Sequence, residues 1–347
     1  MEKPKILYAV QGTGNGHIVR AIEMLPVLRC YAEVDILLSG NQSQVKLPFA
    51  VKYRRAGLVL HYNKRGGVSL LRTLLGNNFI QLLREIRRFP VKQYDLVLND
   101  FECVSAWAAR WRGCPVLDCS HQAALLQKGV PKPGLKNGLA EIILRVYAPA
   151  QPGLRFHYQA YGVQVQPPVI RESIRRARPT SEGPLLVYLP AYADAFLVKF
   201  LQMVSNRDWL VFSPRRSEPA QQGNVRLEPV SREKFTKALI KASGVLTSAG
   251  FETPSEALYL GKKLFVVPIK GQYEQACNAE ALHRMGVPVV RRLHGRSLQL
   301  LREWAYASPR GIRVEAADLD VLVPRLLKQN LPGIEFRQTA PLELRPA

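Results

Sequence analysis

Residues 244–286 read GVLTSAGFETPSEALYLGKKLFVVPIKGQYEQACNAEALHRMG, and two kinds of local pattern alternate along them. A short apolar run ends at Thr247, and a turn of small residues, Ser248 to Gly250, leads into a helical pattern. A second apolar run, KLFVVPI, is followed by a polar loop and another helical pattern. Parallel strands connected by helices produce this alternation. The stretch therefore predicts part of an open α/β sheet.

The same alternation continues on both sides of this stretch. The first half contains the predicted strands KILYAV, EVDILLSG, YDLVLND and CPVLDCS and the helical segment HIVRAIEMLPVLRCY. The second half adds PLLVYLP, DWLVFSP, NVRLEPV and PVVRR as strands and REKFTKALIKA as a helix, after a proline-rich segment at 164–184. Because 347 residues exceed what one core usually serves, we expect two α/β domains, residues 1–165 and 166–330, and a tail, 331–347.

The composition is that of a folded protein with a strong positive charge. Hydrophobic residues make up 47% of the chain and charged residues 22%, which argues against general disorder. The 49 Lys and Arg against 27 Asp and Glu give a net charge of +22. That charge suits an anionic partner such as nucleic acid, an acidic membrane surface or a phosphorylated substrate. Since no nucleic-acid reader module is recognisable, we expect no specific nucleic-acid partner.

Several features favour a cytoplasmic protein. The N-terminus MEKPKILYAV enters a predicted strand directly and lacks the pattern of a secretory leader. No apolar stretch is long enough to span a bilayer. The cysteines form no CxxC pair, and their odd number suits free thiols without structural zinc. They are Cys30, Cys103, Cys114, Cys119 and Cys277.

Residues 52–92 form a basic region in the first half. They hold ten Lys or Arg against the single acid Glu85, and LLRTLLGNNFIQLLREIRRF combines a leucine stripe with a basic face. Such an amphipathic helix either lies on an anionic membrane surface or packs on the core with its basic side in water. The first alternative would make the protein peripheral on the inner face of the membrane.

A glycine-rich turn follows the first predicted strand, in QGTGNGHIVRA, residues 11–21. A strand, a glycine-rich turn and a helix in succession aim backbone N–H groups at an anion. A dinucleotide site requires GxGxxG and an acid on the second strand. Here the glycines are spaced GxGxG, and Asp35 lies at about the expected distance. His17 ends the turn, where it either exchanges a proton with a substrate or caps the turn.

A helix start in the second half has two interpretations. Thr253 as N-cap, Pro254 as first helical residue and Glu256 three residues beyond Thr253 match a capping box. Glu256 would then be purely structural. Alternatively, its carboxylate accepts hydrogen bonds from the two hydroxyls of a ribose, beside a small-residue turn that lets a diphosphate approach.

The order of these motifs resembles the donor site of GT-B glycosyltransferases. A small-residue turn, a Ser-Glu helix start, Gly-Lys-Lys before an apolar strand ending in Pro, and a loop with Gln275 and Asn278 follow one another as in that family. The opening GTGNGH resembles the family's N-terminal loop. The nearest pattern is that of the lipid-linked GlcNAc transferase of peptidoglycan synthesis and the UDP-sugar transferases similar to it. The resemblance implies two Rossmann-like domains with parallel sheets facing across a cleft.

The resemblance also implies roles for individual residues. The backbone around Gly250 would approach the diphosphate, Glu256 would hold the ribose, and Glu274 and Gln275 would lie near the donor-sugar hydroxyls. Glu274 stands where a glutamine is expected in the peptidoglycan enzyme. The implied donor-binding residues are Gly14, Ser248, Gly250, Phe251, Glu252, Thr253, Glu256, Glu274, Gln275, Asn278 and Arg215.

Two further stretches resemble a branch of the same transferases. LNDFECVSAWAAR places Asp100 and Glu102 directly after a strand, and LDCSHQAAL places His121 and Gln122 after the next one. His17, Asp100 and His121 are the candidate catalytic residues. The candidate acceptor-binding residues are Gly16, Glu102 and Gln122. His121 bonded to backbone and Asp100 as a helix cap are the structural alternatives.

Sugar transfer needs a general base for the acceptor hydroxyl and positive groups or N–H dipoles for the leaving diphosphate. The helix near Pro254 and Arg215 or Arg216 would supply the second. We expect no metal and no cofactor, with a UDP-sugar as co-substrate and an acceptor glycan or phospholipid-linked carrier as partner. The alternatives are a UDP-sugar 2-epimerase of similar fold and a dinucleotide-dependent oxidoreductase.

Overall fold

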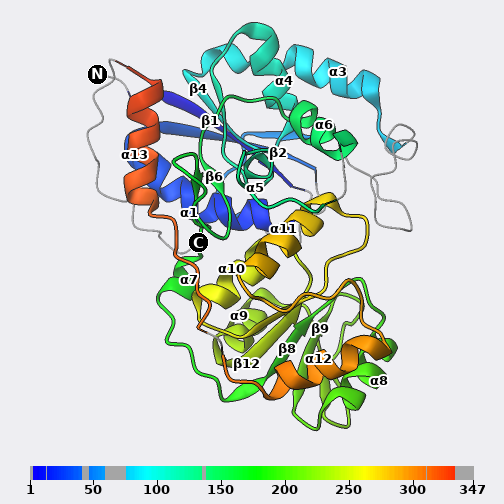
Figure 1. Ribbon diagram of the computed structural model, residues 1–347. Coiled ribbons are helices and arrows are strands. Elements are labelled where there is room, and N and C mark those ends of the chain that lie inside the picture. Colours follow the sequence, from blue (N-terminus) through cyan, green and yellow to red (C-terminus); the bar gives the residue numbers. More distant parts are fainter. Residues whose placement is uncertain are drawn as a thin grey trace.

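The computed structural model describes residues 3–12, 14–40, 47–58, 76–134, 138–309 and 311–332. Among these residues the chain forms two stacked α/β halves (Figure 1). Part of the predicted amphipathic segment, 70–75, and most of the predicted tail, 333–347, lie outside the described residues.

The first half contains a parallel sheet with the strand order β3-β2-β1-β4-β5. Its strands are β1 (Lys5–Gln11), β2 (Glu33–Ser39), β3 (Tyr53–Arg55), β4 (Leu96–Asp100) and β5 (Val116–Asp118). The helices of this half are α1 (Asn15–Tyr31), α3 (Phe79–Arg88), α4 (Cys103–Arg112), α5 (His121–Ala124) and α6 (Gly138–Tyr147), with a 3-10 turn, Val91–Gln93. The short strands β6 (Arg155–Phe156) and β7 (Val165–Gln166) pair with each other.

The second half contains a sheet with the order β10-β11-β9-β8-β12-β13. Its strands are β8 (Gly183–Tyr188), β9 (Trp209–Ser213), β10 (Ala220–Gln222), β11 (Val225–Pro229), β12 (Ala242–Thr247) and β13 (Leu264–Val266), and β10 alone runs antiparallel. The helices that follow β7 along the chain are α7 (Glu172–Arg175), α8 (Asp194–Val204), α9 (Arg232–Lys241), α10 (Glu252–Tyr259), α11 (Tyr273–Arg284), α12 (Gly295–Tyr306) and α13 (Leu319–Asn330). PVVRR, predicted as a strand, forms only one bridge, between Val289 and Val266.

The central strand β1 is apolar on both faces because helices cover both sides of the sheet. Ile6, Tyr8 and Val10 join the core under α1, whereas Leu7 and Ala9 point into the core under α4. This alternation follows from the two-residue period of a strand. The apolar runs of the sequence therefore predicted the buried strands correctly.

The last described helix, α13, crosses back to the first half. It contacts α1, and its buried Val323 and Leu327 share a core with Leu28 and Tyr31 of α1 (Figure 1). The expectation that residues 166–330 form one domain therefore differs from the structure for α13. The physical reason is that the apolar stripe of α13 is buried on the first half, which a chain-order boundary does not take into account.

The strand order places a switch point in each sheet. In the first half, the chain leaves β1 toward β2 on one side and β4 lies on the other. In the second half, β8 lies between β9 and β12. Open α/β sheets bind ligands where the loops diverge at such points, beyond the carboxyl ends of the strands. The turns after β1, β4 and β12 carry the predicted site residues.

Candidate active site

A cavity of about 700 Å³ lies between the two halves. It is lined by the β1–α1 turn and α5 of the first half and by the β12–α10 turn and α11 of the second. Most of the residues predicted from the sequence line it together. They are Gly14, Gly16, His17, His121, Gln122, Ser248, Gly250, Phe251, Glu252, Thr253, Glu256 and Glu274.

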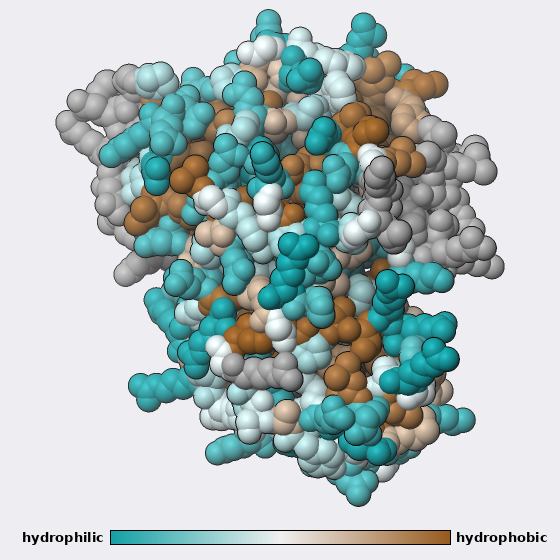
Figure 2. All heavy atoms as spheres, in the orientation of Figure 1, coloured by the Kyte–Doolittle hydropathy of each residue, from teal (hydrophilic) through white to brown (hydrophobic). Residues whose placement is uncertain are grey.

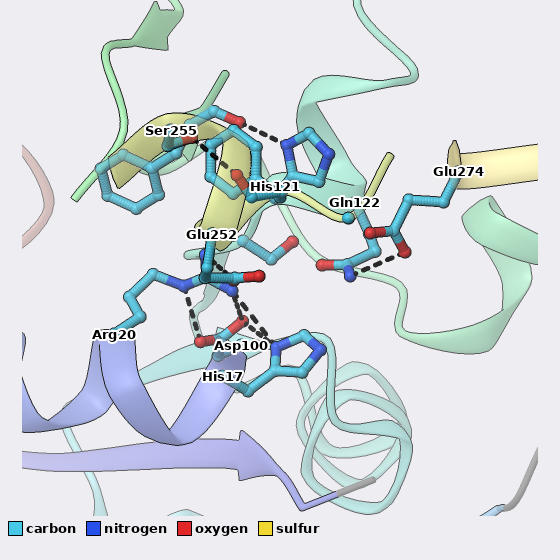
Figure 3. A network of polar contacts seen from close by, with 12 residues as sticks. His17, Arg20, Asp100, His121, Gln122, Glu252, Ser255 and Glu274 are labelled. Carbon is cyan, nitrogen blue, oxygen red and sulfur yellow. Dashed lines mark hydrogen bonds and ion pairs between the residues drawn. The ribbon is translucent and has the colours of Figure 1, made fainter. Parts of the chain in front are cut away.

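His17 lies at the first-half side of this cavity, on the first turn of α1 (Figure 3). Its Nδ1 donates to Asp100 Oδ1 at 2.7 Å, since a carboxylate accepts. Asp100, at the end of β4, is fully buried behind it. The bond leaves His17 Nε2 as the ring nitrogen that can take up a proton. The arrangement is that of a general base oriented by a carboxylate.

Arg20 is the third member of the His17–Asp100 group, and it was not predicted from the sequence. Its Nε donates to Asp100 Oδ2 at 2.9 Å and its Nη2 to Oδ1 at 3.0 Å. Burial alone raises the pKa of Asp100, but the charges of Arg20 and His17 and their hydrogen bonds hold that pKa below its usual value. Asp100 therefore stays ionised. The position of Arg20 three residues after His17 could have indicated it, because residues three apart in a helix lie on the same face.

Glu256 does not form the predicted capping box. The helix α10 begins at Glu252 with Phe251 as its N-cap, and no side chain caps it. Both carboxylate oxygens of Glu256 instead accept from Arg171, from Nε at 2.5 Å and Nη2 at 2.6 Å. The capping expectation was wrong because the N-cap is Phe251, two residues before Thr253, and because Glu256 faces Arg171. Both members of this buried pair line the cavity.

Two further carboxylates face the cavity from the second half. Glu252 reaches the first half: its Oε1 lies 4.0 Å from Arg20 Nη1, and a Cβ at Gly16 would stand 2.0 Å from the same oxygen. Glycine at position 16 therefore leaves room for the Glu252 carboxylate in this position, and a larger residue would displace that side chain. Glu274 Oε2 accepts from Gln122 Nε2 at 3.2 Å, which joins α11 to α5 (Figure 3).

His121 occupies a structural position. Its Nδ1 lies 2.8 Å from the Phe156 carbonyl oxygen and its Nε2 lies 2.8 Å from Asn278 Oδ1, so the neutral ring donates to one of these two acceptors. Its ring stacks on Phe251 at 3.8 Å between centroids. Burial lowers the pKa of His121 to about 4. Both ring nitrogens of His121 thus face protein atoms, one from each half, so the ring joins the two halves. The geometry therefore favours His17 as the base.

The remaining predicted residues do not line the cavity. Glu102, rather than Asp100, caps α4 by accepting from Val104 and Ser105 N–H, and it also accepts from Ser39. Gln275 accepts from Ile269 N–H, and Asn278 donates to Ala249 O. Arg215 donates to the Pro190 and Tyr192 carbonyls. The cavity residues not foreseen include Arg171 and Arg232.

Comparison with known proteins places this geometry in a family. The model of glycosyl transferase family 1 matches residues 4–309. The chain belongs to this family. It is a glycosyltransferase, and its two halves are the Rossmann-like domains of the GT-B fold. None of the curated proteins compared with this glycosyltransferase matches it.

Solved structures share the fold at low sequence identity. The glycotransferase of kitacinnamycin is 14% identical, with 95% of this chain and 100% of that chain covered and a TM-score of 0.60. Arabidopsis thaliana UGT89C1 complexed with UDP is 13% identical, with 95% and 96% covered and a TM-score of 0.56. Acinetobacter baumannii MurG is 14% identical, with 94% and 99% covered and a TM-score of 0.54.

The dinucleotide alternative is not supported by the glycosyltransferase structure. Asp35, its required acid, lies near the start of β2, where it accepts from Lys52 Nζ at 2.6 Å and from the Tyr94 hydroxyl at 2.7 Å. A ribose-binding acid must stand at the carboxyl end of that strand, beside the cavity. The family match likewise gives no support to the epimerase alternative. Among the described residues, no group of three or more His, Cys, Asp or Glu could hold a metal ion.

Proposed function

We propose that this glycosyltransferase moves a sugar from a nucleoside diphosphate sugar, first a UDP-sugar, to a hydroxyl or phosphate of an acceptor. One observation carries this proposal. The hydrogen-bonded pair of His17 and Asp100 lies on one side of a cavity whose other side is formed by the β12–α10 turn. The base and the donor turn come from different halves, so an acceptor bound by the first half and a donor bound by the second would meet in one cavity. No cofactor is needed, since the nucleotide sugar supplies the leaving group.

The reaction follows from the geometry in one displacement. His17 Nε2 takes the proton of the acceptor hydroxyl while Asp100 stabilises the imidazolium that forms. The acceptor oxygen attacks the anomeric carbon, the bond to the diphosphate breaks, and the nucleoside diphosphate leaves. Arg232 lines the second-half side of the cavity and offsets the anionic charge of the donor there.

The nucleotide would lie along the second half. Gly250 would accommodate close backbone approach, since nothing lies within 4 Å of a Cβ built there. Glu256, held by Arg171, presents its carboxylate oxygens for the ribose hydroxyls. Arabidopsis thaliana UGT89C1, which shares the fold, was solved in complex with UDP, and this makes a uridine nucleotide the first candidate.

An anionic membrane surface on the cytoplasmic side is the proposed location of the acceptor, a phospholipid-linked carrier. The helices α3 and α6 each expose apolar side chains. They are joined by α4, whose Arg112 and Trp107 side chains donate to the backbone carbonyls of Ile86 on α3 and Val146 on α6, respectively. The exposed apolar residues are Phe79, Ile80, Leu83, Leu139, Ile142 and Val146. Figure 2 shows apolar residues over this part of the surface with hydrophilic residues around them.

Basic side chains accompany these apolar residues. Arg84, Arg87 and Arg88 lie on α3 and Arg145 on α6. Each basic residue near an anionic surface contributes about 1 kcal/mol to binding. Among the described residues, no helix is both long and apolar enough to cross a bilayer. Attachment through α3 and α6 would therefore be peripheral.

A thermal-shift panel tests the nucleotide. UDP should raise the melting temperature of the wild type, because a ligand that binds only the folded state stabilises it. Glu256→Ala should lose most of that shift. The matched control is Glu233→Ala, which removes an exposed carboxylate outside the cavity and should keep the shift. No shift with any of UDP, TDP, GDP or ADP would contradict the proposal.

A further inference from the structure

A second, smaller cavity lies in the second half, away from the candidate active site. We call it the distal pocket, and its volume is about 100 Å³. It is bounded by the end of α10, the turn into β13, part of α12 and the segment that follows α12. Leu258 lines it from the last turn of α10, whereas Glu252, the first residue of that helix, lines the interdomain cavity. The two cavities therefore lie at opposite ends of α10.

The wall of the distal pocket is mostly apolar. The apolar side chains that form it are Leu258, Leu264, Val287, Pro288, Leu300 and Ile312. Leu258 and Leu264 are buried, but Leu300 is 41% exposed, so the pocket opens to the surface on that side. A closed apolar cavity of about 150 Å³ holds one benzene molecule. The distal pocket therefore has room for a ligand body of about six carbon atoms.

Trp304 brings a hydrogen-bond donor without an acceptor to this wall. Its side chain is only 6% exposed, and its ring packs edge-on against Phe265 at 5.6 Å between centroids. Among the described residues, no group accepts a hydrogen bond from its buried Nε1. A buried donor without a partner is costly. This N–H therefore indicates a ligand that brings an acceptor.

Lys263 adds a positive charge beside the indole. Its Nζ lies 5.3 Å from the centroid of the Trp304 ring and donates to the carbonyls of Ala305 and Ala307 at 2.7 and 2.8 Å. An ammonium group has three hydrogens, so one remains for a ligand. Burial, together with the charge of Arg207, lowers the pKa of Lys263 to about 8. Since no described carboxylate pairs with this ammonium, a bound anion would stabilise it.

The rim of the distal pocket carries another cation and one acid. The guanidinium of Arg313 lies against Gly261, which lines the pocket, because a Cβ built on Gly261 would stand 3.1 Å from Arg313 Nη2. The acid that lines the pocket, Glu303, is exposed and accepts from Gln299 Nε2 at 2.8 Å. Lys263 and Arg313 thus outweigh one exposed carboxylate, so the charges favour a ligand with a negative group.

We propose that the distal pocket binds a small apolar carboxylate. The apolar body lies against the wall between α10 and α12, and the carboxylate accepts from Trp304 Nε1 and Lys263 Nζ. One indole N–H and one ammonium hydrogen suit a monoanion, whereas a phosphate dianion would need more donors than these two supply. The inference does not depend on the proposed function, because the distal pocket and the interdomain cavity share no lining residue.

The indole N–H signals of the four tryptophans in a nuclear magnetic resonance spectrum provide the test. Benzoate is the probe, and benzyl alcohol is its neutral counterpart of nearly the same size. Benzoate should shift the Trp304 signal saturably with a Kd of about 1 mM or below, and benzyl alcohol should bind about fivefold more weakly. The spectrum of Trp304→Phe assigns the signal. Trp209 has a buried N–H without a partner among the described residues but does not line the distal pocket, so its signal should stay unchanged.

Two variants identify the groups that attract the carboxylate. Lys263→Met should lower benzoate affinity about fivefold, to that of benzyl alcohol. Arg313→Gln changes an exposed side chain and should lower benzoate affinity about threefold. Arg296→Gln makes the same change on α12, outside the pocket, and should keep the wild-type affinity. Melting temperatures establish that each variant folds.

The contrary outcomes are specific. Absence of a saturable Trp304 shift with benzoate overturns the inference. Equal affinities for benzoate and benzyl alcohol, or an equal shift with inorganic phosphate, overturn the choice of a carboxylate. If Lys263→Met does not fold, Arg313→Gln decides, and an unchanged affinity in that variant contradicts the attraction by positive charge.

Discussion

Two carboxylates at the candidate site are each held by a guanidinium group. Arg20 bonds both oxygens of Asp100, and Arg171 bonds both oxygens of Glu256. A bidentate arginine fixes the orientation of a carboxylate as well as its charge. Asp100 then orients the base, and Glu256 faces the cavity. Both arginines are thus positioning residues for groups that meet the substrates.

Replacing the carboxylate of Asp100, which is bonded to His17, tests the pair of Arg20 and Asp100. Asp100→Asn should lower the transfer rate about hundredfold or more, because the amide cannot hold His17 with Nδ1 protonated or stabilise its charged form. UDP affinity should change little, since Asp100 does not line the cavity. Initial rates of nucleoside diphosphate release and calorimetry measure the two effects. Asp95→Asn, just before the same strand, is the control, and equal rates in both variants would refute the role.

The difference in affinity between UDP and 2′-deoxy-UDP tests the pair of Arg171 and Glu256. A carboxylate held in one orientation can accept from both ribose hydroxyls, so the wild type should bind UDP about tenfold more tightly than 2′-deoxy-UDP. Arg171→Met should bring the two affinities together by releasing Glu256. Calorimetry provides both values. Arg176→Met, an exposed arginine of the same segment, should keep the wild-type ratio, and a ratio retained in Arg171→Met would show that Arg171 is only structural.

The segments around the site differ in what they contribute to the protein. The Gly-Lys-Lys segment before β13 stabilises the fold and does not line the interdomain cavity: Lys262 donates to the Thr180 and Ile240 carbonyls, and Lys263 to those of Ala305 and Ala307. The turns after β1 and β12 present the site residues. The helices α3 and α6 expose apolar surface away from it.

A charge on α6 tests the proposed membrane contact. Ile142 is 58% exposed, so Ile142→Glu should leave the melting temperature nearly unchanged. Its binding to vesicles of anionic phospholipid should fall about tenfold or more, because the variant places a carboxylate among apolar and anionic lipid groups. Vesicle cosedimentation measures this.

The control is the same substitution at another exposed apolar position. Val321 lies on α13, on the other side of the first half from α3 and α6 (Figure 1), and is 57% exposed. Val321→Glu should bind vesicles like the wild type. Equal loss in both variants would mean that net charge, and not α6, governs binding.

In the whole molecule, buried contacts join the two halves beside the cavity. His121 meets Asn278 and stacks on Phe251, and the Tyr158 hydroxyl donates to Gly250 O at 2.9 Å. The helix α13 adds apolar contact with α1. These contacts hold the base and the donor turn at opposite sides of one cavity, so the spacing of the site depends on them.

Acid should weaken these contacts. The pKa of His121 falls from 6.5 to about 4 on folding, so the unfolded chain takes up a proton below pH 6.5 that the folded protein takes up only near pH 4. Stability contributed by neutral His121 is therefore present above pH 6.5 and lost as the pH falls toward 4, by about 3 kcal/mol. His157, whose pKa burial also lowers, acts in the same direction.

Denaturant unfolding between pH 7 and pH 4 measures this loss. His121→Asn, which does not titrate, should show a shallower decline than the wild type. His283→Asn, on the last turn of α11 and outside the cavity, should decline like the wild type. Parallel declines in wild type and His121→Asn would contradict the assignment.

The sequence by itself determined the α/β class, the strands of both sheets apart from β3 and β10, and the turns that carry the site, because these depend on local periodicity and turn chemistry. His17 could be found in this way, whereas Gly250 and Glu274 were indicated by the resemblance to GT-B glycosyltransferases. Strand PVVRR and the start of α10 were misjudged, since pairing and helix starts respond to tertiary neighbours.

Only the tertiary structure decided which polar groups bond to one another. Arg171 and Glu256 are 85 residues apart, and Asp100 and Arg20 are 80 residues apart. Chain spacing carries no signal for such pairs, because they form where strand ends from distant segments converge. The position of α13 on α1 has the same cause: an apolar stripe predicts burial, but the surface that buries it depends on the assembled fold.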